Sequence, residues 1–407
     1  MDGRIEAPGL SGGADARPLG RGAMLALLTA LSAFGMLATN LYLPSLPSMA
    51  QGLGTDARGA QATLSVFLAG FAVAQLIAGP LSDRYGRRPV LLAGAVLYAV
   101  ASGLCALAQT LDAMLALRVL QAIGACAGTV LVRAILRDLY QGPALTRAFA
   151  IITTFMAAAP GFSPLVGGVI ETAWGWRANF MAIAVFATVA ALATWRWIGE
   201  TNRHPNLTLS PAAMIRDYAL LLVQPAFIGP AAAAALALGG LFAYFSATPA
   251  LFVGQLGLSP AQFGLIPAGT VPAVFLGGAL APKLAQRLGE RPAILLALGL
   301  MVLGPALMAV LFATQAPGLV VAIAPFVIFL LGLGVINPLA TAAALRPFPH
   351  HAGAASALIG FLQMAAGTLT TLSATLLPLP ANLPLPITIL ACSLGGLIVY
   401  ALSARKA

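Results

Sequence analysis

Few side chains in the apolar part of this chain could do chemistry. Arg118 is the one charge that lies well inside an apolar run, about two helical turns from the end of that run. Gln121 follows it at a spacing that places both on one helix face. A buried arginine is costly in a bilayer and normally faces the protein interior or water. We therefore expect Arg118 and Gln121 to handle substrate or protons, with snorkelling of Arg118 to the outer surface as the alternative.

Two further polar groups end the first apolar run. Asn40 and Tyr42 stand just before Pro44. They could line a cavity that binds a substrate, or they could cap a helix and hydrogen-bond a neighbour. The sequence leaves both interpretations open.

The remaining ionisable residues exclude several kinds of active site. None of the 11 acids falls near the centre of an apolar run, the 3 His lie between runs, and the 3 Cys lack metal-ligand spacing. An enzyme site within the membrane needs clustered acids or histidines, or a nucleophile with a base. We therefore expect no catalytic residues, no metal and no cofactor. Asp112 and Glu171, at the outer ends of apolar runs, remain with Arg118 as candidates for proton coupling; Asp112 could instead cap its helix.

The composition assigns the chain to one class. Its 407 residues are 60% hydrophobic and 8% charged, with a mean hydropathy of +0.95, whereas soluble domains carry roughly 25% charged residues. We predict an all-α polytopic membrane protein. The net charge of +10 would suggest nucleic acid for a soluble protein. Here the basic residues anchor helices at one face of the bilayer, so no nucleic-acid partner is expected.

At roughly 20 residues per crossing, the length allows about twelve transmembrane helices. The predicted spans are 23–43, 60–80, 89–109, 113–133, 147–170, 177–198, 225–247, 262–282, 292–313, 318–343, 353–377 and 384–404. They form two pseudo-symmetric six-helix halves. The expected parts are a disordered cytoplasmic tail (1-22), a first half (23-198), a cytoplasmic linker (199-224) and a second half (225-407). Two such halves around a midplane site are the layout of an alternating-access carrier.

The basic residues also predict the orientation. Of the 21 Lys and Arg, all but Arg58, Arg118 and Arg177 fall in the two ends of the chain or in loops on one side of the predicted bundle. The positive-inside rule makes that side the cytoplasm. Both termini are therefore expected in the cytoplasm.

The most charged short segment is 79–89, between two apolar runs. It contains Gly79, Asp83, Arg84, Gly86, Arg87 and Arg88. So many charges cannot lie in hydrocarbon, and the segment must be a tight aqueous turn between two helices. Its end, Gly-Arg-Arg-Pro at 86–89, returns as Gly-Glu-Arg-Pro at 289–292, which indicates that the two halves are duplicated.

Two other sets of residues could serve a moving helix bundle. The fifth predicted span is dense in Pro and Gly, at Pro160, Gly161, Pro164, Gly167 and Gly168. Such a helix is kinked and lets a neighbour approach closely, so it suits a hinge, a sealed contact or plain packing. The second half offers side chains that could line a binding cavity or simply pack, at Tyr244, Phe245, Asn337, Phe361, Gln363 and Met364.

These segments resemble the major facilitator superfamily. Residues 79–88 look like its signature loop between helices two and three, and Arg118-x-x-Gln121-x-x-Gly124 is similar to its helix-four motif. Residues 159–168 resemble the helix-five motif of the proton antiporters, with Ala-Pro where Gly-Pro is usual. Segments 42–47, 137–140, 176–177 and 348–356 look like the Bcr/CflA subfamily, which includes exporters of bicyclomycin and chloramphenicol-type drugs.

The resemblance implies an inner-membrane exporter of small organic compounds that works against a proton gradient, expected as a monomer. It also implies that the 79–89 turn is a conformational latch, with Asp83 facing the start of the eleventh span at Gly353 and Ser356. One departure matters: Asn40 stands where the subfamily usually has Asp, and an amide cannot titrate. An uncoupled or differently coupled facilitator of the same fold is therefore the alternative. A membrane enzyme or a receptor is a third possibility that the sequence disfavours.

Overall fold

The computed structural model describes residues 19–202, 211–314, 318–348, 351–376 and 384–403. These residues form helices and no strand. The first half contains α1 (Arg21–Ser32), α2 (Phe34–Asn40), η1 (Leu43–Ser45), α3 (Leu46–Gly52), α4 (Ala57–Tyr85), α5 (Arg87–Leu107), α6 (Leu111–Leu139), α7 (Gly142–Trp174) and α8 (Trp176–Trp197). The linker contains α9 (Pro211–Leu222). The second half contains α10 (Pro225–Pro249), η2 (Ala250–Gln255), α11 (Pro260–Leu288), α12 (Glu290–Thr314), α13 (Leu319–Leu345), α14 (Ala352–Leu376) and α15 (Pro384–Ser403).

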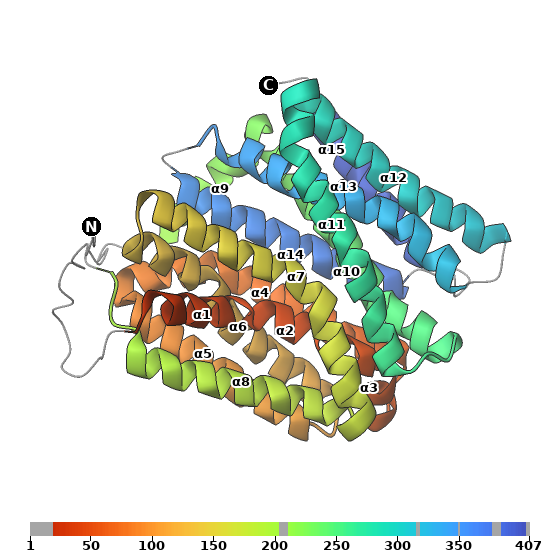
Figure 1. Ribbon diagram of the computed structural model, residues 1–407, viewed down its shortest axis with the longest axis horizontal. Helices are drawn as coiled ribbons and strands as arrows, with labels where there is room; N and C mark the ends of the chain where they lie inside the picture. The colour runs from red at the N-terminus through yellow and green to blue at the C-terminus, as the bar shows by residue number, and fades with distance from the viewer. Residues whose placement is uncertain (1–18, 203–210, 315–317, 349–350, 377–383, 404–407) are drawn as a thin grey trace, which may run out of the picture.

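The twelve predicted spans correspond to these helices. In the described part of the chain, eleven helices are long and apolar enough to cross a membrane, and the bent pair Gly22–Ser32 and Phe34–Gly52 supplies a twelfth crossing. The prediction of an all-α polytopic membrane protein is confirmed. Figure 1 shows the first half, red to yellow-green, beside the second half, green to blue.

The first span differs from the single helix expected over 23–43. It bends by 43° near Ala33 and continues to Gly52. Thr29 and Ser32 donate their hydroxyl hydrogens to the carbonyl oxygens of Leu25 and Leu28, and such bonds to the preceding turn bend helices. The linker also differs from a plain polar connection, because α9 forms within it.

Sharp turns at glycine join the long helices. Gly86, between α4 and α5, has φ +96°, and Gly289, between α11 and α12, has φ +89°. Each glycine is the first residue of a Gly-x-Arg-Pro sequence and directly precedes a helix. Its backbone conformation is one that L side chains rarely adopt. The repeat found in the sequence is therefore also a repeat of backbone geometry.

We call the end of the bundle with the α4–α5 turn the Gly86 end, and the opposite end, with the α7–α8 turn, the Gly175 end.

The halves meet along two helix pairs, α4 with α14 and α7 with α11. The α7–α11 contact is a contact of backbones. A Cβ placed on Gly264 would lie 2.5 Å from the Pro164 carbonyl oxygen, and a Cβ on Gly168 would lie 2.2 Å from that of Pro260. Close approach of this kind is how transmembrane helices gain packing energy in the absence of a hydrophobic driving force. The Pro/Gly segment of the fifth span lies in this contact between the halves.

We expect Gly264→Ala to destabilise the protein. The added methyl group must push α11 away from α7, and overpacking of this kind costs about 1–3 kcal/mol. Thermal unfolding of the purified protein in detergent measures the loss. Gly269→Ala on the same helix is the matched control, because nothing lies within 4 Å of its added Cβ. Equal melting temperatures for the two variants would contradict the close contact.

Candidate functional site

Arg118 lies at the centre of the first half and is 0% exposed. The guanidinium carbon is 4.5 Å from the ring centroids of both Tyr42 and Phe67. Nε donates a hydrogen bond to the Thr63 carbonyl oxygen at 3.2 Å, and Nη1 donates to the Gln121 side chain. The aromatic faces attract the cation where water cannot reach it.

The buried charge of Arg118 is not neutralised by any acid that the structure describes. Among the described residues, no carboxylate lies within ion-pair distance of Arg118, and its Nη2 has no hydrogen-bond partner. The expected candidate, Asp112, is exposed in the first turn of α6, so the structure does not bring the two together. Asp112 is not the cap of that helix either. The Thr110 hydroxyl accepts the hydrogen bond from the Ala113 N–H, because the capping position precedes the first turn.

A chain of hydrogen bonds runs from Gln121 to the bend in the first span. The Gln121 amide donates to Ser102 at 2.8 Å, and Ser102 donates to the Tyr98 carbonyl oxygen at 2.6 Å. The Tyr98 hydroxyl then donates to the Phe34 carbonyl oxygen at 2.8 Å. This chain joins α6, α5 and α2. Arg118 and Gln121 therefore join three helices of the first half, and their contact with a substrate stays a prediction.

Asn40 and Tyr42 belong to the same packed region. Asn40 is 2% exposed and donates to the Met36 carbonyl oxygen at 2.9 Å, while its own oxygen has no partner among the described residues. The Tyr42 hydroxyl lies 3.2 Å from that of Thr63. Local hydrogen bonding, the alternative left open by the sequence, describes both residues in this structure.

The candidates of the second half are dispersed. Tyr244 is buried and stacks on Phe326 with 3.4 Å between ring centroids, and its hydroxyl has no partner among the described residues. Phe245 is buried beside it. Asn337 is exposed on α13. The remaining three are half-buried on α14, at Phe361, Gln363 and Met364.

A cavity of about 390 Å³ lies between the halves at the Gly86 end. It is bounded by α4, the start of α5, α6, α7, α9 and α14. Gly79 and Asp83 line it from the first half, and Gly353 and Ser356 line it from the second. With Arg87, five residues of the predicted latch therefore surround one space, although no hydrogen bond joins Asp83 to a described residue of α14. Sequence reasoning missed Gln75, a buried lining residue whose Oε1 has no partner among the described residues.

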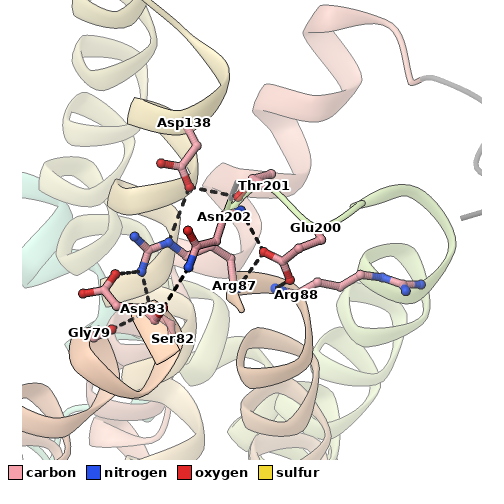
Figure 2. A network of polar contacts seen from close by, with 9 residues as sticks. All are labelled: Gly79, Ser82, Asp83, Arg87, Arg88, Asp138, Glu200, Thr201 and Asn202. Carbon is pink, nitrogen blue, oxygen red and sulfur yellow. Dashed lines mark hydrogen bonds and ion pairs between the residues drawn. The ribbon is translucent and has the colours of Figure 1, made fainter. Parts of the chain in front are cut away.

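Arg87 is the centre of the polar network beside this cavity (Figure 2). It pairs with Asp83 and with Asp138, the latter at 3.4 Å, and it donates to the Ser82 hydroxyl at 2.5 Å. Thr201 donates to the same Asp138 carboxylate at 3.0 Å. The network thus ties the α4–α5 turn to the end of α6 and to the first residues of the linker.

Glu200 completes the turn and was missed from the sequence. Its carboxylate accepts hydrogen bonds from the backbone N–H groups of Arg87 and Arg88, at 2.9 and 3.1 Å, which lie at the N-terminus of α5 (Figure 2). A carboxylate at this position stabilises the helix dipole. The Arg88 side chain donates to the Trp195 carbonyl oxygen, and exposed Arg84 lies over the Tyr85 ring.

Two further groups face the same end of the bundle from α9. Asp217 lies 3.8 Å from Nδ1 of His351, and the Tyr218 hydroxyl donates to the Leu76 carbonyl oxygen at 3.2 Å. Burial, together with the Asp217 carboxylate, raises the pKa of Tyr218 above its ordinary value. Tyr218 therefore stays neutral and acts as a hydrogen-bond donor.

Glu171, in the last turn of α7, is buried at the Gly175 end with an exposed fraction of 8%. Ser48 of α3 donates to its Oε1 at 2.5 Å, and Oε2 has no partner among the described residues. Close by, the Asn179 amide donates to Ser45 at 2.7 Å and to the Gly167 carbonyl oxygen at 3.1 Å. Of the expected proton-coupling candidates, Glu171 is thus the carboxyl that the protein encloses.

A model of the Major Facilitator Superfamily matches residues 25–371. The chain belongs to this superfamily. Two solved structures share the fold: a D-xylose-proton symporter (TM-score 0.74, 17% identity, covering 94% of this chain and 96% of that one) and a POT family transporter in complex with 5-aminolevulinic acid (TM-score 0.75, 15% identity, 96% and 98%).

Similar curated proteins are resistance proteins. The chain is 32% identical over 386 residues to a chloramphenicol resistance protein of Pseudomonas aeruginosa, covering 93% of this chain and 90% of that one. It is 29% identical over 358 residues to multidrug resistance protein D of Escherichia coli strain K12, covering 87% and 89%. A bicyclomycin resistance protein homolog of Haemophilus influenzae is 28% identical over 383 residues, covering 92% and 94%.

These relatives confirm the resemblance to Bcr/CflA-type drug-resistance transporters of the superfamily. The protein is a multi-pass transporter of the bacterial inner membrane and not an enzyme.

We expect Arg118→Lys to lower the stability of this transporter. Lysine keeps the charge but cannot bond Thr63 and Gln121 together, and hydrogen bonds of a charged group contribute about 1.5–3 kcal/mol. Thermal unfolding in detergent measures the loss, with Arg58→Lys as the control at an exposed position. An unchanged melting temperature combined with lost substrate binding would instead favour direct contact with the substrate.

Proposed function

We propose that the protein exports small amphiphilic compounds, of the chloramphenicol or bicyclomycin class, by alternating access in exchange for protons. The observation that carries the proposal is the similarity, over most of the chain, to proteins named for resistance to these compounds. The one-sided distribution of Lys and Arg supports a cytoplasmic location of the Gly86 end and of both termini.

The distribution of contacts between the halves supports alternating access. At the Gly175 end, η1 of the first half contacts both α10 and α11, and α7 meets α11 backbone to backbone. The halves leave a cavity of about 390 Å³ at each end, and the one at the Gly175 end lies between α3 and α4 of the first half and α10 and η2 of the second. The close backbone contact near the Gly175 end is therefore the observation that favours the Gly86 end as the side that would receive a compound for export.

We propose Glu171 as the proton-binding group of the exchange. Asn40 cannot titrate, and Asp112 is exposed without contact to Arg118. Glu171 is buried, and it lies one helical turn beyond Gly168, where α7 meets α11. Separation of the halves there would expose the carboxyl to water. A charged carboxylate is favoured in the open form and a protonated one in the closed form, which links proton binding to the movement.

In liposomes that contain the purified protein, we expect an imposed pH gradient to drive uphill uptake of chloramphenicol. Glu171→Gln keeps the bond from Ser48 but cannot bind a proton. It should reduce gradient-driven uptake about tenfold or more while exchange of labelled for unlabelled chloramphenicol continues. Asp112→Asn, at the same end of the bundle, is the control and should behave as the wild type.

The alternative is an uncoupled facilitator, and Asn40 is the feature that favours it. It predicts equilibration of chloramphenicol without accumulation, and no response of the wild type to the gradient. If the pH gradient drives uptake equally in the wild type and in Glu171→Gln, proton exchange stands and Glu171 is not its proton-binding group.

We further propose that Asp83, Arg87 and the start of α14 form the latch at the cytoplasmic end. Asp83→Asn removes the ion pair with Arg87 while the Asp138 contact remains. We expect chloramphenicol transport to fall about tenfold with little change in binding, because the loss affects the balance between states and not the binding site. Transport in liposomes and stabilisation by chloramphenicol in thermal unfolding separate these effects. Arg84→Gln is the control, and a normal turnover for Asp83→Asn would contradict the latch.

A further inference from the structure

A pair of arginines that no acid of the described chain contacts faces the cavity at the Gly86 end. Arg133 and Arg137 of α6 both line it, and both are exposed. Their spacing puts them one helical turn apart on one face of the helix. Neither makes a hydrogen bond or an ion pair with any described residue. Two cations held this way repel each other, and an anion between them would remove that cost.

The other charged groups of the cavity already have partners. Arg87 is paired with Asp83 and Asp138, and Asp217 lies beside His351. With Arg87, Arg133 and Arg137 against Asp83 and Asp217, the lining carries one net positive charge. Low-dielectric walls strengthen such a field and raise the local concentration of counter-ions.

The second half adds to this field. Gly353, Ala354 and Ser356, in the first turns of α14, line the cavity opposite α6. The N-terminus of a helix carries unsatisfied N–H groups and the positive end of the helix dipole. An anion in the cavity would meet two guanidinium groups from one half and this helix end from the other.

The rest of the lining is suited to an apolar body. Val130, Leu131, Phe149 and Met214 face the same space. The volume, about 390 Å³, lies within the usual range of small-molecule sites, roughly 300–1,000 Å³. The cavity thus has a positively charged side and an apolar side. Met214 and Phe149 on the apolar side can adjust to compounds of different shape.

We propose that this cavity binds the acidic group of a transported compound, with Arg133 and Arg137 as its ligands. The chemical class is an amphiphile with a carboxylate, sulfonate or phosphate at one end. The inference rests on the proposed export function and extends its substrates from the chloramphenicol and bicyclomycin class to amphiphiles that also carry an acid. The planar guanidinium groups match the planar oxygen pair of a carboxylate.

Chloramphenicol and its hemisuccinate ester provide a matched pair of probes, since the ester adds one carboxylate to the same body. Binding to the purified full-length protein is measured by isothermal titration. We expect the wild type to bind the hemisuccinate more tightly than chloramphenicol. The double variant Arg133→Gln, Arg137→Gln should weaken hemisuccinate binding about tenfold and leave chloramphenicol binding within about twofold. Arg147→Gln, at an exposed residue of α7 outside the cavity lining, is the control.

Equal losses for both probes, or no loss for either, would overturn the anion site. A lipid headgroup is the other source of such an anion, so the titration is repeated in nanodiscs made with zwitterionic lipid only and with added phosphatidylglycerol. If phosphatidylglycerol binds at the two arginines and the hemisuccinate does not, the assignment to a transported compound is overturned. If hemisuccinate binding depends on the arginines while liposomes show no transport, the export function fails and the anion site stands.

Discussion

The fold of the first half depends on enclosing one positive charge. The Arg118 guanidinium has no acid partner in the part of the chain that the structure describes, so its stabilisation comes from two aromatic faces, a backbone carbonyl and an amide. Those groups belong to different segments, and their positions are fixed together. Tyr42 comes from the broken first span, Thr63 from α4 and Gln121 from α6. Arg118, which the sequence marks as functional, thus also holds the bent first span against α4 and α6.

Much of the fold could be predicted because the bilayer restricts it. Apolar runs of membrane-crossing length must be helices, and a charged turn such as 79–89 must lie outside the hydrocarbon. The repeated Gly-x-Arg-Pro sequence predicted the duplication that Gly86 and Gly289 show in their backbone angles. The bend at Ala33 could not be predicted, since it results from local hydroxyl bonds and packing and not from a proline.

The candidate site was less predictable, because side-chain partners depend on distances between helices. Asp112 and Arg118 are close in sequence, but one faces out at the helix end and the other faces in. Glu200 gave no signal in the sequence, since it caps a helix that lies more than one hundred residues away from it along the chain. Arg133 and Arg137 counted only as topological anchors until the cavity showed that they share an interior surface.

The place where α7 and α11 touch has a mechanical consequence. The contact at residues 164–168 leaves about 9 Å of α7 on the Gly175 side and about 33 Å on the Gly86 side, at a rise of roughly 1.5 Å per residue. In the proposed alternating access, the helix would act as a lever with unequal arms. A small displacement at the short arm, where Glu171 lies, would become a displacement more than about three times larger at the long arm beside the cavity. Backbone-to-backbone contact suits such a fulcrum, since no side chain has to change its rotamer as the lever turns.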